Sequence, residues 1–502
     1  MRHHWRALVA LVIVALSIRL AALASDPHPG ELAGLSGPSG EVARNILVHG
    51  RWFVVNANAP TASMPTAEGE RPAQLGGREH RLVDPAEIDY TRADAHPQFV
   101  PYRIQMPGPA LLLAAIWRLT GPQRYLPLQL LQALLDALAV LLVYWISRRL
   151  YGRDRAALLA AAGYALFVPL AMLMTIPFYD PWAVLLTIAS FALFLWSLDT
   201  PSPGRRLLAM GATVGAGLWF RPALAILPLA LAVALVPSMG WRRAARHGLV
   251  PLMVALVIVA PYSLWTLSDR GQFTPVSVGV GQVLWEGLGE RPNSFGAVLN
   301  DDVTFEQVHR ERPKLAYATP AYDSYLRHKA VRAIAADPGY YLGLLGRRVV
   351  SAAIPLGQRG RLERAKAALD PAGDRPVTGL VRRGPELATA LLAAAAGPLL
   401  LTLAVIGLAS TWRHSRREHA LLLAVAGATF AVPVLLLVEW RYVAPATFVY
   451  LVLGGVALDR AMTAVLKRPR RGVESERGRG NGDATGGEDV GGHTEGDRDP
   501  IG

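Results

Sequence analysis

The sequence contains no cysteine. Without a thiol the chain can form neither a disulfide framework nor a thiolate nucleophile, and it cannot hold a cysteine metal cluster on either side of a membrane. Charged residues are also scarce, at 18% against 52% hydrophobic, and the apolar residues occur in runs long enough to cross a bilayer. The scarcity of charge and the length of the apolar runs exclude an ordinary soluble domain and predict an integral membrane protein.

The formal net charge of +13 does not indicate a nucleic-acid partner. The arginines form no helical stripe interleaved with aromatic residues, because they cluster in short segments between the apolar runs. This pattern is typical of residues that determine membrane topology. The chain also shows no inverted internal repeat of the kind found in many secondary transporters.

Ten apolar runs predict an all-α polytopic membrane protein with about ten transmembrane helices. The runs lie at about 7–24, 126–147, 156–176, 181–198, 207–220, 222–239, 249–267, 387–411, 418–438 and 443–459. We interpret the first run as a signal anchor, because it is long and many further spans follow it. A signal peptide cleaved near Ala22 is the alternative.

The distribution of arginine predicts the orientation in the membrane. Clusters of basic residues lie at 148–155, 205–206, 242–246, 413–417 and 467–471. All of them are cytoplasmic if both termini are cytoplasmic and the segment 108–120 grazes the membrane without crossing it, whereas a full span there would put the clusters outside. We therefore expect a multi-pass protein of the cytoplasmic (inner) membrane, surrounded by membrane lipids, with its active site on the extracytoplasmic side.

The predicted topology divides the chain into six parts. They are a signal-anchor helix (1–24), a first extracytoplasmic loop with interfacial helices (25–125), a six-helix transmembrane region (126–267), a second extracytoplasmic loop (268–386), C-terminal transmembrane helices (387–466) and a disordered cytoplasmic tail (467–502). In the second loop, 322–350 suits an amphipathic helix broken at Pro338, which either lies at the membrane interface or packs on the protein.

Six stretches follow one another in a set order relative to the apolar runs. They are Glu41-Val-Ala-Arg-Asn-Ile-Leu-Val-His-Gly50, Tyr102-Arg-Ile-Gln-Met-Pro-Gly-Pro109, the segment 134–160, Phe220-Arg-Pro222, Gly281-Gln-Val-Leu-Trp-Glu-Gly287 and Arg441-Tyr-Val-Ala-Pro445. In this order they resemble the GT-C class of membrane glycosyltransferases, in particular the bacterial relatives of the dolichyl-phosphate-mannose-protein mannosyltransferases and of the lipid A aminoarabinose transferase.

The resemblance implies a GT-C-like helical bundle with two large extracytoplasmic loops. It also implies a hexosyl or pentosyl glycosyltransferase, which moves a sugar from a polyprenyl-phosphate donor to a lipid, glycan or protein acceptor at the outer face of the membrane. Two other functions remain open, a non-catalytic GT-C-like scaffold and a transporter or flippase for lipid-linked sugars.

An inverting transfer needs a carboxylate that takes the acceptor proton. The resemblance places this base early in the first loop, normally as an aspartate, but this sequence has Leu35, Ser36 and Ser39 there. Glu31 and Glu41 are the nearby candidates, although a glutamate on a solvated helix face needs no function. Asp180, at the outer end of a span, matches the second acidic site of the class and is equally well explained as a helix N-cap.

The leaving phosphate needs positive groups. Arg221 and Arg441 are lone arginines at outer span ends, where the charge bias does not place them, so each is a candidate phosphate ligand, with snorkelling as the alternative. Further candidates for donor phosphate or sugar binding are Arg103, Tyr102, Trp285 and Glu286, although Trp285 is equally explained as a packing residue.

Two ionisable residues, Arg19 and Asp136, fall inside apolar runs and should face the bundle or reach the interface, because exposure to lipid costs several kcal/mol. A transporter would use Asp136 as a relay, but a packing carboxylate bonded to its neighbours is the simpler interpretation. We expect no cofactor. A divalent metal is not favoured, since Asp180 has no acidic neighbour at close spacing.

Overall fold

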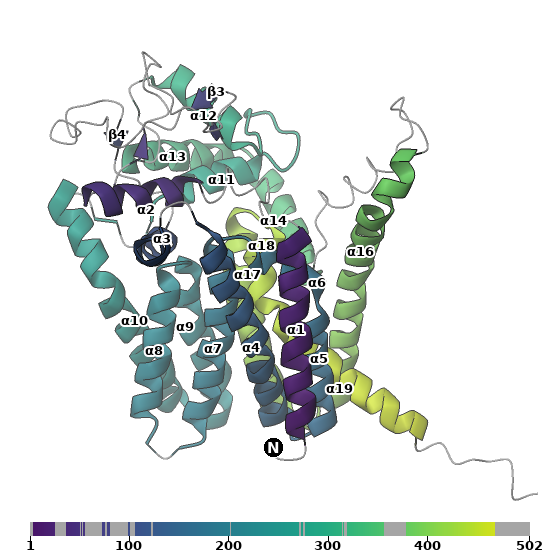
Figure 1. Cartoon of the computed structure of the whole chain (residues 1–502). Helices are drawn as coiled ribbons and strands as arrows, with labels where there is room; N and C mark the ends of the chain where they lie inside the picture. The colour runs from purple at the N-terminus through teal and green to yellow at the C-terminus, as the bar shows by residue number, and fades with distance from the viewer. Residues whose placement is uncertain are drawn as a thin grey trace, which may run out of the picture. The chain divides into compact units, whose positions relative to one another are not determined.

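The structure is a computed structural model of the chain (Figure 1). It describes residues 4–25, 37–50, 52, 54–55, 73–75, 78–80, 99–100, 106–121, 124–200, 202–270, 273–274, 277–313, 315, 319–355 and 378–466. The chain divides into two compact units, Met1–Asp459 and Arg460–Gly502. In the second unit the structure describes residues 460–466, the last turns of a helix, so the fold and the site belong to the first unit.

The long helices have the length and composition of membrane spans. In the described part of the chain seven helical segments meet this test, or eight if a bent pair is counted as one span. The seven are α1 (Trp5–Ser25), α4 (Leu126–Tyr151), α7 (Tyr179–Leu198), η4 with α9 (Pro222–Ala225 and Ile226–Met239), α10 (Trp241–Arg270), α17 (Arg416–Leu436) and α18, η5 and α19 (Trp440–Val443, Ala444–Ala446 and Thr447–Leu466). The prediction of an all-α polytopic membrane protein is confirmed.

Helices occupy all ten predicted runs, but not all of them qualify as spans. The bent pair is α5 (Asp154–Leu166) and α6 (Val168–Met174), which meet at 54°. The other two are α8 (Gly204–Leu218), with only 15 residues, and α16 (Thr378–Thr411), whose apolar described part is Ala395–Thr411. The number of about ten full spans therefore stays a prediction.

The first loop contributes short elements at one end of the long helices. Helix α2 (Gly37–His49) packs on α3 (Pro107–Thr120) around buried Trp117. The strands, two or three residues each, form two antiparallel pairs: β1 (Val54–Val55) with β4 (Phe99–Val100), and β2 (Ala73–Leu75) with β3 (Arg78–His80). At 14 residues, α3 is about 21 Å long and too short to cross a hydrocarbon core of about 30 Å.

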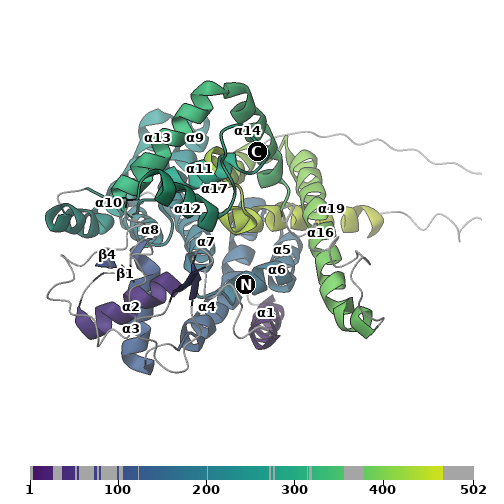
Figure 2. The same cartoon turned by 90° about the horizontal axis from the view of Figure 1, so that it is seen from above.

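The second loop forms a small helical layer of its own. It consists of α11 (Val280–Leu288), α12 (Asp301–Glu311), α13 (Pro320–Ala336) and α14 (Pro338–Ala353). Pro338 starts a new helix, as predicted, and α13 buries Tyr322, Leu326 and Ala330 in a cluster with Trp285, so α13 is a packing helix. Seen from above, α2 and α3 lie together on one side and α11, α13 and α14 lie together on another (Figure 2).

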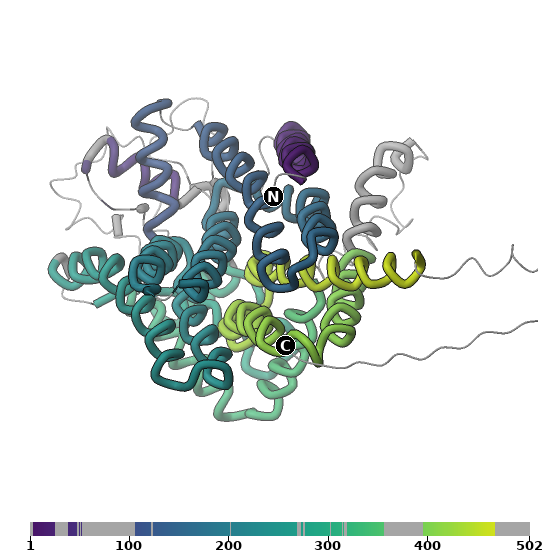
Figure 3. The backbone as a smooth tube through the Cα atoms, turned by 90° about the horizontal axis from the view of Figure 1, so that it is seen from below, coloured from purple at the N-terminus to yellow at the C-terminus, as the bar shows by residue number. Residues whose placement is uncertain are grey.

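The N-terminal helix is held at the edge of the bundle by a buried ion pair. Figure 3 shows α1 at the periphery beside α4 and α5. Arg19 Nε donates to Asp136 Oδ2 at 2.7 Å, the Tyr164 hydroxyl donates to Asp136 Oδ1 at 2.5 Å, and both charged side chains are fully buried. The prediction that Arg19 and Asp136 face the bundle is confirmed. Since both groups are bonded to neighbours, Asp136 has the environment of a packing carboxylate.

Candidate active site

Asp180 lies in the first turn of α7 and is 2% exposed. Phe178, not Asp180, is the N-cap residue of this helix, and no side chain caps it. The carboxylate accepts instead from a distant cation: Arg221 Nη1 lies 3.0 Å from Asp180 Oδ1. In the described part of the chain Oδ2 of Asp180 has no hydrogen-bond partner. The N-cap interpretation of Asp180 is therefore wrong, because its side chain forms an ion pair and makes no capping bond.

Arg221 is held in the short extended segment between α8 and η4, where Pro222 begins the next helical turn. Its side chain is 10% exposed, too buried for a snorkelling residue. Besides Asp180, Nη1 donates to the backbone carbonyl of Arg441 at 3.1 Å. Nε and Nη2 of Arg221 have no hydrogen bond in the described part of the chain. Most of the donors of this guanidinium are thus free to bind a ligand.

Arg441 comes from α18, at the start of the last span, and meets Arg221 over one aromatic ring. The Cζ atoms of Arg221 and Arg441 lie 4.8 and 5.0 Å from the centre of the Tyr442 ring. Arg441 also donates to Glu439 and, at 3.2 Å, to the Tyr442 hydroxyl. Two guanidinium groups can lie this close because Asp180 and Glu439 offset their charges and the electron-rich ring attracts both.

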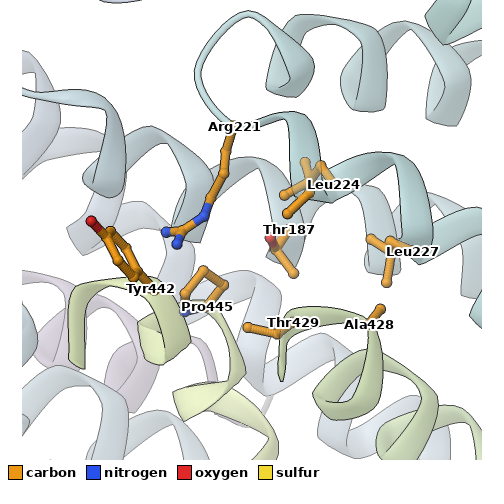
Figure 4. A pocket seen from close by; sticks show the side chains of 9 residues that line it. Thr187, Arg221, Leu224, Leu227, Ala428, Thr429, Tyr442 and Pro445 are labelled. Atoms are coloured by element: carbon orange, nitrogen blue, oxygen red, sulfur yellow. The ribbon is translucent and has the colours of Figure 1, made fainter. Parts of the chain in front are cut away.

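A narrow pocket opens beside these cations (Figure 4). Its volume is about 300 Å³, including space open to solvent, and it is lined by Thr187, Arg221, Ala223, Leu224, Leu227, Ala428, Thr429, Tyr442 and Pro445. In Figure 4 the Arg221 guanidinium points toward Tyr442 and Pro445, whereas Leu224, Leu227 and Ala428 line the other part. The site therefore combines a charged end with an apolar extension.

Helix α11 adds a neutral carboxyl group to the edge of the site. Glu286 is 4% exposed and accepts a hydrogen bond from Gln282 Nε2 at 2.8 Å. Burial, together with the nearby charges of Asp301 and Glu439, raises the pKa of Glu286 to about 9. Near neutral pH this side chain is protonated, so it can donate a hydrogen bond but cannot act as a base.

Trp285, the preceding residue, packs inside the second-loop cluster. It is 1% exposed in the second-loop cluster, donates to Gln307 at 3.3 Å and carries Lys329 Nζ over its ring at 4.4 Å. These contacts support the packing alternative for Trp285.

Arg348 of α14 ties the second loop to the segment that carries Arg441. Its buried guanidinium donates to the carbonyl oxygens of Gly287 at 2.7 Å and Leu435 at 3.1 Å, and to Glu290 at 3.0 Å. These carbonyls lie at the C-terminal ends of α11 and α17, where helices leave acceptors unsatisfied. The sequence analysis did not single out Arg348. The signal that could have indicated it is Gly287, because the lack of a side chain there lets α11 approach α17.

Of the remaining predicted residues the structure describes only Glu41. Glu31, Tyr102 and Arg103 lie outside the described residues. Glu41 is half-buried on α2, and none of the described interactions of Asp180, Arg221, Arg441 or Glu439 involves it. The structure thus brings together Asp180, Arg221 and Arg441, with Glu286 at the edge.

The donor set does not suit a divalent metal. Asp180 and Glu439 each face an arginine, and among the described residues no group of three histidine, aspartate or glutamate side chains is arranged to hold a metal ion. The absence of a metal stays a prediction.

Together, the spans and the buried charged site define a polytopic helical membrane protein with a candidate active site at one end of its bundle. Residues 96–265 match the family model described as dolichyl-phosphate-mannose-protein mannosyltransferase. The chain is similar to undecaprenyl phosphate-alpha-4-amino-4-deoxy-L-arabinose arabinosyl transferase 2 of Pseudomonas fluorescens, with 32% identity over 181 residues. The aligned segment covers 34% of this chain and 30% of the relative. The predicted resemblance is confirmed over this segment.

Solved structures also align with the chain at low identity. The Archaeoglobus fulgidus oligosaccharyltransferase tethered to an acceptor peptide has a TM-score of 0.49 at 15% identity, covering 92% of this chain and 50% of that chain. ArnT from Cupriavidus metallidurans bound to undecaprenyl phosphate has a TM-score of 0.39 at 16% identity, covering 91% of this chain and 78% of that chain. The chain therefore spans half of that oligosaccharyltransferase and less than a third of the curated relative.

Proposed function

We propose that the protein is a glycosyltransferase that moves a hexosyl or pentosyl group from a polyprenyl-phosphate donor to a lipid, glycan or protein acceptor. The observation that carries the proposal is the meeting of Arg221 and Arg441, 220 residues apart, over Tyr442 beside a buried carboxylate. The family match over residues 96–265 and the similarity to an undecaprenyl-phosphate aminoarabinose transferase support it. Bilayer lipids, the polyprenyl donor and the acceptor are the partners.

The chemistry assigns a role to each charged group. The free N–H groups of Arg221 and Arg441 bind the donor phosphate and stabilise the negative charge that develops as the bond between the sugar C1 and the phosphate oxygen breaks. The acceptor oxygen or nitrogen forms the new bond to C1 and transfers its proton to Asp180. Oδ2 of Asp180 serves here as the base, because Oδ1 is engaged by Arg221.

We further propose that this site faces the outer side of the cytoplasmic membrane and that both termini are cytoplasmic. Arg149 pairs with Asp199, and Arg153 pairs with Asp459, so the arginine-rich ends of the spans gather at one end of the bundle. On α4 that end lies about 30 Å, at 1.5 Å per residue, from Gln129, which contacts the segment before Asp180. The positive-inside bias then supports an outer position for the site.

The proposal is tested with purified protein reconstituted in lipid and a panel of radiolabelled polyprenyl-phosphate sugars. Wild-type protein should transfer a label from at least one donor. Asp180→Asn should abolish turnover while the donor still binds, whereas Arg221→Lys and Arg441→Lys should raise the donor KM, because lysine keeps the charge and loses the fork. Transfer that Asp180→Asn leaves unchanged would contradict the assigned base.

A non-catalytic scaffold is the second candidate, favoured by one observation. The stretch of the first loop where the family normally has an aspartate has Leu35, Ser36 and Ser39, and none of the described interactions of Asp180, Arg221 or Arg441 involves Glu41. A scaffold should bind a donor without turning it over in the same assay, and binding by Arg221→Leu should then be lost while no transfer is seen in any variant.

A further inference from the structure

Three polar side chains interrupt the apolar surface of α4. Gln129, Gln132 and Asp136 have spacings of three and four residues, which place them on one face of the helix. Their exposed fractions are 2%, 0% and 0%. Buried polar groups in a membrane span are costly unless each has a partner, so the partners show what this face does.

The two glutamines bind the backbone at the end of α6. Gln129 Nε2 donates to the carbonyl of Thr175 at 2.7 Å, and Gln132 Nε2 donates to the carbonyl of Ile176 at 3.1 Å. These carbonyls follow the last turn of α6, where no further helical N–H is available to them. The side chains of α4 therefore replace the missing helical donors.

The carbonyl bound by Gln132 lies in the turn that leads to Asp180. The backbone N–H of Phe178 donates to the Ile176 carbonyl at 2.8 Å, closing a tight turn over Pro177. Helix α7 begins directly afterwards at Tyr179, and Asp180 is its second residue. Gln132 is thus linked to Asp180 through four residues of buried or half-buried backbone.

Asp136, on the same face, supports a different feature. It binds Arg19 and Tyr164, and Arg19 Nη1 donates to the carbonyl of Ala165 at 2.6 Å, at the break between α5 and α6. This group holds the bend rather than the turn before Asp180. Tyr164, a fully buried partner of Asp136 on α5, therefore offers a control of similar burial that does not touch the turn before Asp180.

We propose that Gln132, with Gln129 one turn before it, is a positioning residue that sets the place of the Asp180 carboxylate against Arg221. The inference rests on the proposed function, in which Asp180 takes the acceptor proton. Displacing a reacting group by about 1 Å can lower a rate by about 100-fold, so a hydrogen bond that holds the turn has a measurable effect on turnover.

The decisive variants are Gln132→Leu and Gln132→Glu, compared with Tyr164→Phe as the control. Oε1 of Gln132 has no partner in the described part of the chain, so glutamate breaks no bond of Oε1, and it lacks a donor for the Ile176 carbonyl only when it is ionised. Gln132→Leu should lower kcat about 10- to 100-fold, with a donor KM within about threefold of wild type. Tyr164→Phe, which loses one bond to Asp136, should keep the wild-type kcat.

The pH profile separates positioning from a structural role. A protonated glutamate at position 132 can donate to the Ile176 carbonyl, and an ionised one cannot. The kcat of Gln132→Glu should therefore approach the wild-type value at low pH and fall as pH rises. The wild-type pH profile should not show this decrease. Equal kcat values for Gln132→Leu and wild type, or parallel losses of kcat and thermal stability in Gln132→Leu and Tyr164→Phe, would overturn the proposal.

A readout without transfer keeps the two proposals apart. Because the chain has no cysteine, Asp180→Cys carries the only thiol, and its pKa and reaction rate depend on its distance to the Arg221 guanidinium. Adding Gln132→Leu should change the thiol labelling rate at least about threefold, while adding Tyr164→Phe should not. If the wild type transfers no sugar but Gln132→Leu changes the labelling rate of the thiol, the proposed function fails and the positioning role of Gln132 stands. If Gln132→Leu leaves the labelling rate unchanged, the positioning role fails.

Discussion

The guanidinium of Arg221 donates to the backbone carbonyl of Arg441 at 3.1 Å. One residue precedes the sixth predicted run and the other precedes the tenth, so this bond joins two parts of the chain that only the fold brings together. It orients Arg221 so that Nη1 is used by protein acceptors and the other nitrogens are free. The geometry is that expected of a preorganised anion site.

Arg348 should be essential for stability. Arg348→Leu leaves Glu290 unpaired and the carbonyls of Gly287 and Leu435 without their donor, so we expect a loss of about 3–5 kcal/mol. The measurement is thermal or denaturant unfolding in detergent or lipid. The exposed neighbour Arg347→Leu is the matched control and should change stability little. Similar unfolding midpoints for the two variants would show that the hydrogen bonds of Arg348 contribute nothing to stability.

Two glycines should respond oppositely to alanine. A Cβ at Gly287 would lie 2.0 Å from the carbonyl oxygen of Leu436, so Gly287→Ala must push α11 away from α17 and destabilise the protein. A Cβ at Gly343, within α14, meets nothing within 4 Å, and Gly343→Ala should stabilise by about 0.5–1 kcal/mol. Melting temperatures of the pair check this. A tolerated Gly287→Ala would speak against the close approach of the two helices.

Glu286 should make stability depend on pH. Burial raises its pKa to about 9 in the folded protein, whereas an unfolded glutamate titrates near 4.5. Between these values the folded state binds more protons than the unfolded state, so this group's contribution to the free energy of unfolding falls as pH rises. Glutamine at position 286 stays neutral. The melting temperature of Glu286→Gln minus that of the wild type should therefore increase from pH 5 to pH 9. A constant difference across that range would show that the carboxyl is ionised in the fold.

The topology can be tested with single cysteines in this cysteine-free chain. Ser294 lies in the second loop and Ser238 near the end of α9, and both are exposed. An impermeant thiol reagent should label Ser294→Cys in intact cells and should label Ser238→Cys only after lysis. A cysteine at Thr91 should behave like the one at Ser294. Labelling of Ser238→Cys in intact cells would contradict the proposed orientation in the membrane.

Several candidate site residues were visible in the sequence because a membrane restricts where charge can lie. Arg221 and Arg441 stood out as lone cations at span ends, and Asp180 stood out as a carboxylate at the start of a span. The structure places all three in one cluster. The N-cap interpretation of Asp180 failed because Arg221, 41 residues away, binds the carboxylate and no local backbone N–H does.

Other features could not be read from the sequence, since they depend on neighbours distant in the chain. Arg348 resembled any cation of an amphipathic helix until its contacts with α11 and α17 were seen. Likewise, Glu286 is neutral only because folding buries it beside Asp301 and Glu439.

The sequence by itself determined the helical membrane architecture and the residues that bear charge at span ends. These follow from the length of apolar runs and the cost of placing charge in lipid, which are local properties of the chain. Tertiary structure alone decided that Arg221 meets Arg441, that α4 holds the turn before Asp180 and that Arg348 joins two helix ends. Hydrogen bonds and ion pairs act over about 3 Å, so their partners are chosen by packing rather than by order along the chain.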